Sequence, residues 1–446
     1  MGELSEQKIA MLRGLVSASP DEVVRGLERA VCTEGGSGPL AAIGALVEAE
    51  AADRTLRFTV MAPVATLFGP VSPDGRPTFP RIALKLIWNA LKSDRPDWVR
   101  AAAAALQYYD PDEAVPEIFD KLCLEAAEGL RAGENDNYLA AAAACEAARP
   151  GGAEMLILCL ELAPIVRPAM QRLGEWLQRM TEERRATARL AYRDATAKGE
   201  AGGPLFFEML AGHLPQPWTI LRIISAVMDH PSERYLASSE VAAFGVRTLD
   251  GVEALLERVK ALRVGANVEA GRAAARAVLQ SVEAMAELEQ SVQLSKDGPW
   301  GVRLGKLKQA LAMAVESRLR EIDEAVLRAL PMQTLRYSGR LVKNAPRLDT
   351  LPNDAAVEWA ICLLTLADGV RSCASEAGFG SVRGKILDNL SKHLDQYVED
   401  VLEQIRLGDI KSDDNTRAHL EVAARILGLA RDESSASIVR RRAAAA

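Results

Sequence analysis

Residues 82–124 read IALKLIWNALKSDRPDWVRAAAAALQYYDPDEAVPEIFDKLCL. Apolar side chains recur there at three- and four-residue spacing on both sides of an alanine run at 101–105, which is the periodicity of an α-helix. Alanine favours the helix because it loses no side-chain entropy there. Polar turns containing proline, at 93–96 and 110–111, divide the stretch. This stretch therefore predicts short helices joined by tight turns.

The same stretch resembles a HEAT repeat. Asp97 lies in the turn, Val99 and Arg100 follow it, and the alanines at 101–104 open the second helix, as in that family. The resemblance covers about one unit, Ile82 to Leu124. It implies a curved solenoid in which neighbouring helix pairs bury each other's apolar faces and the concave side binds partners.

The helical periodicity extends over almost the whole chain, and strict alternation rich in Val, Ile and Thr is missing, so we expect no sheet. The sequence predicts an all-α fold with two regions. Residues 1–264 form antiparallel helix pairs stacked as an α-solenoid-like, HEAT-like array. Residues 265–446 form a bundle of longer helices with a C-terminal tail. Apolar stripes in 268–294 and 302–330 predict one long antiparallel αα-hairpin in this bundle.

Local chemistry predicts several helix starts. A capping box is expected at 19–22, an aspartate cap at 110–113 and another start at 353–354. The most apolar run, at 155–166, is shorter than the roughly 20 residues of a membrane span and contains Glu161 and Pro164, so it predicts a buried helix. The final arginines and alanines at 440–446 are expected to form a frayed, solvated tail, with an acidic docking partner as the alternative.

Composition narrows the class of protein. The 446 residues are 49% hydrophobic and 26% charged, as in ordinary globular proteins, and the formal net charge of -7 disfavours bulk attraction to nucleic acid. The first residues lack the pattern of a signal peptide, and the six cysteines form no Cys-x-x-Cys and lie mostly in apolar helical stretches. We therefore expect a cytoplasmic protein with reduced, buried thiols and no contact with a membrane.

No catalytic motif stands out. The glycine-rich segment 378–385 fails the P-loop spacing, since three residues instead of four separate its last two glycines and Ile386 follows the lysine. None of the four histidines has the spacing of a zinc or di-iron site. A Gly-x-Ser-x-Gly elbow is missing too. The sequence thus predicts no catalytic residue, no metal site and no cofactor.

Basic side chains gather in 172–193. Arg185, Arg189 and Arg193 share one face of the expected helix, although acidic residues accompany them. Two interpretations stay open here, an ordinary solvated helix and a contact surface for an acidic protein partner. Nucleic acid is the weakest alternative, because few aromatic side chains accompany the arginines.

Aromatic residues concentrate just downstream, at Phe206, Phe207 and Trp218. They form either a core at the junction of two packing units or an exposed groove in which an aromatic side chain anchors a partner. Together with the three arginines they are our candidate partner-binding residues.

We therefore expect a non-enzymatic scaffold or adaptor that binds another protein. The alternative is an all-α enzyme or small-molecule sensor with a pocket between helices lined by His213, Trp218 and Arg222, and the third is a HEAT-like nucleic-acid binder. Self-association through the long hairpin is a further alternative.

Overall fold

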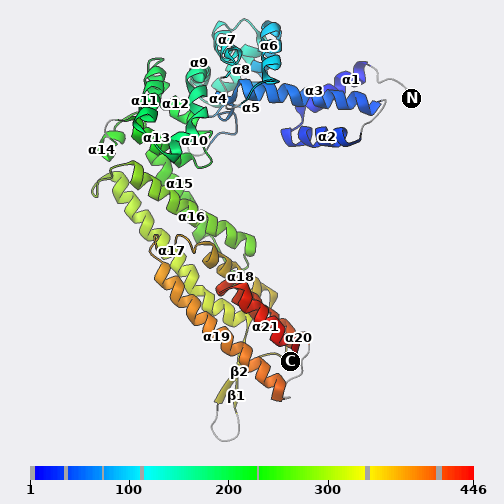
Figure 1. Ribbon diagram of the computed structural model, residues 1–446, viewed down its shortest axis with the longest axis vertical. Coiled ribbons are helices and arrows are strands. Elements are labelled where there is room, and N and C mark those ends of the chain that lie inside the picture. Colours follow the sequence, from blue (N-terminus) through cyan, green and yellow to red (C-terminus); the bar gives the residue numbers. More distant parts are fainter. Residues whose placement is uncertain are drawn as a thin grey trace. The chain divides into compact units, whose positions relative to one another are not determined.

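A computed structural model describes residues 6–34, 39–72, 75–110, 115–228, 231–336, 342–407 and 414–445 (Figure 1). These residues form 21 α-helices, one 3-10 helix and one two-stranded sheet. The expected all-α class is confirmed. The chain divides into two compact units, Met1–Asp229 and His230–Ala446. None of the helices in the described residues combines the length and the apolar composition needed to cross a membrane.

The first unit is built around one apolar helix. Its elements are α1 (Glu6–Ala18), α2 (Asp21–Glu34), α3 (Pro39–Val60), α4 (Ala62–Ala65), α5 (Arg81–Asp94), α6 (Pro96–Leu106), α7 (Glu117–Ala132), α8 (Asp136–Ala148), α9 (Gly152–Gln171), α10 (Leu173–Gln178), α11 (Glu182–Thr196), α12 (Gly202–Ala211), η1 (Pro217–Thr219) and α13 (Ile220–Val227). Helix α9 packs against α4, α7, α8, α11 and α12. It contains the run 155–166, which is apolar apart from Glu161, and most side chains of this run are buried, as predicted.

The helices expected to form a HEAT-like pair do not make the most extensive contacts of this unit. Helix α5 packs along α8 more widely than along α6, and α7 packs mainly on α9. The repeat therefore stays a prediction.

The second unit consists of longer helices. Its elements are α14 (Glu233–Leu236), α15 (Ala242–Lys260), α16 (Val268–Ser291), α17 (Pro299–Ala329), β1 (Met332–Arg336), β2 (Val342–Pro346), α18 (Asp354–Gly369), α19 (Gly380–Leu407), α20 (Asp414–Ala430) and α21 (Glu433–Ala445). The two long helices of the predicted hairpin are present, but α16 and α17 touch over only a small part of their length. Both pack instead on α15 and α18 (Figure 1).

The unit boundary differs from the expected division at 264. Helix α15 packs on α16 and α17, which places it in the second unit and moves the division to 229. The change from short to long helices near residue 264 therefore does not coincide with the boundary between the two packing units.

The expectation of no sheet is wrong at one place. Strands β1 and β2 pair in antiparallel register, with Met332 opposite Pro346 and Thr334 opposite Asn344. Each strand has only five residues, and cationic residues interrupt them, so the alternating pattern is too short to stand out.

The predicted helix starts have different outcomes. The Asn353 side chain accepts a hydrogen bond from Ala356 N at 3.0 Å and caps α18, as predicted. The box at 19–22 does not form, because the Ser19 hydroxyl donates to the carbonyl oxygen of Leu15 in the preceding helix. The predicted start at 110–113 lies mostly outside the described residues, and α7 begins at Glu117.

The C-terminal segment is not a frayed tail. Helix α21 packs on α20 and extends to Ala445. The Arg440 guanidinium pairs with Glu421 at 2.9 Å and with Glu433 at 2.7 Å, and Arg442 pairs with Glu399 at 2.6 Å. The arginines thus fasten this helix to acidic side chains of its own unit.

Candidate functional site

Two of the candidate aromatic residues belong to the core. Phe206 and Phe207 in α12 are fully buried, and their ring centroids lie 5.4 Å apart. Phe207 also stacks on Tyr192 of α11 at 5.1 Å. Helix α12 is enclosed because it is apolar almost all round, so these rings hold helices together and form no exposed groove. Trp218, in η1, is partly exposed.

The basic face of α11 is largely occupied by contacts within the unit. Arg185 pairs with Glu182 at 2.9 Å, and Arg189 Nε donates to the carbonyl oxygen of Val227 at 3.2 Å. Arg193 is exposed in the last turn. Only part of the predicted face is therefore left for an acidic partner.

The predicted pocket residues do not converge. Arg222 Nη1 donates to the carbonyl oxygen of Leu177 in α10 at 2.6 Å. His213 instead faces the backbone of Ala62 and Pro63 in α4, and burial lowers the pKa of its imidazole despite these nearby carbonyl groups. The two side chains serve separate helix contacts.

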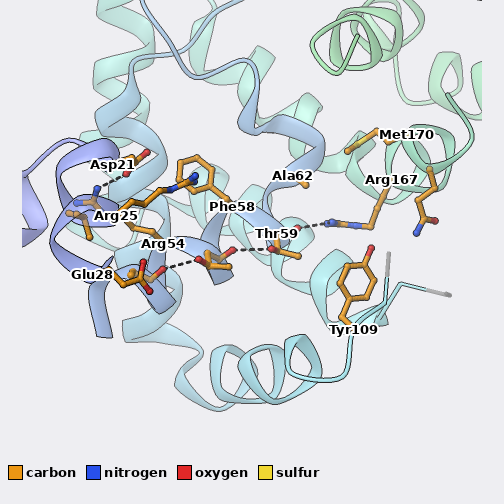
Figure 2. A pocket seen from close by; sticks show the side chains of 14 residues that line it. Asp21, Arg25, Glu28, Arg54, Phe58, Thr59, Ala62, Tyr109, Arg167 and Met170 are labelled. Atoms are coloured by element: carbon orange, nitrogen blue, oxygen red, sulfur yellow. Dashed lines mark hydrogen bonds and ion pairs between the residues drawn. The ribbon is translucent and has the colours of Figure 1, made fainter. Parts of the chain in front are cut away.

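A different part of the first unit contains a cavity of about 570 Å³ (Figure 2). Helix α3 supplies its floor, α2 one wall, and the end of α9 with Tyr109 the opposite wall. Its lining consists of Asp21, Val24, Arg25, Glu28, Ala51, Arg54, Thr55, Phe58, Thr59, Ala62, Tyr109, Arg167, Met170 and Gln171.

One buried arginine fixes the α2 side of the cavity. Arg54 pairs with Asp21 and, at 2.8 Å, with Glu50. Its Nη2 donates to the carbonyl oxygens of residues 16, 17 and 19 at 3.1, 3.3 and 2.9 Å, where α1 ends. Burial acts to lower the Arg54 pKa, but the two ion pairs outweigh it and raise the pKa overall. Arg54 therefore joins α1, α2 and α3 with a permanent charge.

A second buried arginine fixes the α9 side. Arg167 Nε contacts Asp120 at 2.6 Å, and its two Nη atoms donate to the carbonyl oxygens of Thr59 and Val60 at 3.1 and 2.6 Å. These carbonyls lie at the C-terminus of α3, where intrahelical donors run out. Figure 2 shows Arg54 and Phe58 at one end of the cavity and Arg167 with Tyr109 at the other.

The space between the two arginines has an apolar and aromatic lining. Phe58 and Met170 are half-buried, and Tyr109 meets Phe119 edge to face at 5.8 Å. The hydroxyl groups of Thr55 and Thr59 donate to carbonyl oxygens one turn earlier in α3, each at 2.9 Å. The cavity thus offers a largely apolar surface between polar groups that the fold already holds in place.

A buried thiol lies close to the α9 side of the cavity. The Cys123 thiol lies behind Arg167 Nη2 at 3.6 Å, and burial raises its pKa to about 11, so at neutral pH it is a protonated, poorly nucleophilic group. Within the described ranges, no three His, Cys, Asp or Glu residues lie close enough together to hold a metal ion.

Sequence reasoning missed this cavity, although one signal was present. Arg167 stands in an otherwise apolar stretch of α9, residues 162–170. A buried charge requires a partner, so an arginine in such a segment indicates a place where several elements meet.

No protein-family model, curated protein or solved structure matches this chain.

Proposed function

We propose that this chain is a non-enzymatic helical adaptor of the cytoplasm that binds a segment of another protein in the cavity between α2, α3 and α9. The observation that carries the proposal is a cavity of about 570 Å³ whose walls are held apart by two buried, fully engaged arginines. A HEAT-like relationship of the short helices is part of the same proposal.

The lining has the composition of an interface centre. Phe58, Tyr109 and Met170 provide an apolar pocket for an anchoring side chain, and Arg25, Glu28 and Gln171 stand among the polar lining residues. Binding energy in protein interfaces concentrates on such anchored side chains, whereas the polar surroundings mainly fix orientation. The opposite charges of Arg25 and Glu28, one turn apart on α2, favour a segment with both charge signs beside its apolar anchor.

The engaged arginines favour binding over catalysis. Arg54 and Arg167 already bind carboxylates and backbone carbonyls. If either arginine bound a substrate instead, the contacts that hold α1 and α3 would break. A catalytic cation instead needs donors directed at the reacting group.

The test compares two variants with the same substitution. Met170→Glu places a charge in the cavity, while Met313→Glu places one on an exposed position of α17, where the methionine is 58% exposed. Tagged wild type and both variants are incubated with native lysate, and captured proteins are identified by mass spectrometry. Circular dichroism checks that both variants fold.

The proposal predicts a protein that wild type and Met313→Glu capture and Met170→Glu loses, and that then binds purified wild type directly. Equal capture by all three proteins would refute the cavity as the binding site. Native mass spectrometry of the purified chain provides the contrasting outcome, since a small molecule retained by wild type and lost from Met170→Glu would establish the sensor alternative.

A further inference from the structure

The second unit contains a basic cavity of about 650 Å³ at the turn between α15 and α16. Arg258 lies at the end of α15, Arg263 lies in the connecting loop, and Arg276 lies in α16. The other lining residues are alanines, Leu262, Val264 and Gln280. Three arginine residues from separate elements thus line one cavity, and none of its lining residues carries a carboxylate.

The positive charge of this cavity is not neutralised by its surroundings. Residues 257–276 contain five basic residues and two acidic residues, in a chain whose net charge is -7. Two of the five have carboxylate partners: Lys260 pairs with Glu257 at 2.8 Å, and Arg272 pairs with Glu269. Neither partner lines the cavity.

The arginines that line the cavity are the other three. Arg263 Nη1 donates to the carbonyl oxygens of Lys260 and Leu262, the latter at 3.1 Å, and these contacts hold the guanidinium without supplying a counter-charge. Arg258 and Arg276 are exposed and form no ion pair within the part of the chain that the structure describes. A ligand in the cavity can therefore contact either arginine without breaking an ion pair of the described residues.

We propose that this cavity binds a phosphomonoester carried by a small molecule with an apolar body. Planar guanidinium groups bind phosphate oxygens through paired, charge-assisted hydrogen bonds, and a doubly charged phosphate accepts from several arginines at once. The volume of about 650 Å³ exceeds the needs of a free phosphate ion, and Ala270, Ala273 and Ala277 provide an apolar floor for the rest of the molecule.

Titration calorimetry with phenyl phosphate as the probe tests this site at low ionic strength, where screening is weakest. Wild type is expected to bind one equivalent saturably. Arg276→Gln and Arg258→Gln should each weaken binding by about tenfold or more, because each removes a charge-assisted contact. Arg272→Gln is the matched control on the same helix, because its guanidinium is paired with Glu269 outside the cavity, and it should leave the affinity within about twofold.

Three results would overturn the proposal. Wild type without saturable binding would dismiss the site, and equal losses in Arg272→Gln and Arg276→Gln would show only general attraction to a basic surface. Benzoate binding as tightly as phenyl phosphate would refute the preference for phosphate. The site lies in the second unit, so its outcome is independent of capture by the cavity of the first unit.

Discussion

Replacing Arg167 with methionine tests whether one arginine holds the wall of the first-unit cavity. The change keeps an unbranched side chain of similar length but removes every donor. It leaves the Asp120 carboxylate without its partner at 2.6 Å and the carbonyl oxygens of Thr59 and Val60 without the guanidinium. The Arg167 side chain is only 5% exposed, so water does not replace these contacts without a change in packing.

The expected cost follows from these contacts. Breaking a buried ion pair by removing one partner costs about 3–5 kcal/mol, and the lower value applies because the Asp120 side chain is 28% exposed and regains part of its hydration. We therefore expect Arg167→Met to lower the local free energy of unfolding by about 3 kcal/mol, which corresponds to about a hundredfold loss of amide protection.

Hydrogen exchange measured by mass spectrometry reports this loss region by region. Peptides from the end of α3 and from α7 should lose protection, while peptides from α17 serve as the internal reference. Arg100→Met is the matched control, because Arg100 forms an exposed pair with Asp97 and its removal should cost less than about 1 kcal/mol. Adding Asp120→Asn to Arg167→Met should restore part of the protection by removing the orphaned charge. Unchanged exchange at α3 in Arg167→Met would refute the structural role assigned to this arginine.

Three further predictions concern other parts of the chain. Burial lowers the folded-state pKa of His213, so its contribution to the free energy of unfolding should be complete above the unfolded pKa of about 6.5 and decrease as the pH falls below it. Urea titrations at several pH values should show that His213→Gln abolishes this decrease and that His393→Gln retains it. The opposite pattern would contradict the prediction. Gly271→Ala places a methyl group against a backbone oxygen of α18 and should lower the free energy of unfolding by about 1–3 kcal/mol. Gly305→Ala meets no atom within 4 Å and should stabilise α17 by about 0.5–1 kcal/mol in the same denaturation assay. Equal effects of the two substitutions would argue against close packing of α16 on α18. Cys123, with its pKa raised to about 11 by burial, should resist iodoacetamide in the folded protein and react in urea, as followed by peptide mass spectrometry, and rapid native alkylation would contradict the buried position.

Features that depend on a few neighbouring residues could be predicted from the sequence. The Asn353 cap follows from local hydrogen bonding, and the enclosed helix α9 follows from its high apolar content. Pairings between distant elements could not be predicted in this way. The apolar stripes of α16 and α17 are correct, but a stripe does not specify its partner, and α18 occupies the position expected for the other arm of the hairpin.

The candidate site could not be predicted from the sequence for the same reason, since it depends on the packing of distant residues. Phe206 and Phe207 are conspicuous in an aromatic-poor chain, but only packing decides whether such rings face solvent, and here both are buried. The first-unit cavity, in contrast, is lined by residues as far apart as Asp21 and Gln171. No window of sequence brings these positions together.

The arginines show most clearly the difference between what the local sequence indicates and what the packing decides. Residues 172–193 contain six arginines, more than the five basic residues of 258–276, and basic content alone therefore pointed to α11. In α11, however, Arg189 meets the carbonyl oxygen of Val227 and Arg185 meets Glu182, so the fold satisfies part of this charge. At the turn between α15 and α16, residues 257–276 contain two acidic residues, Glu257 and Glu269, and both pair with basic side chains that do not line the cavity. We therefore infer that an arginine available for binding is indicated by few acidic residues and few free helix ends in its neighbourhood. The number of basic residues in a segment does not indicate it.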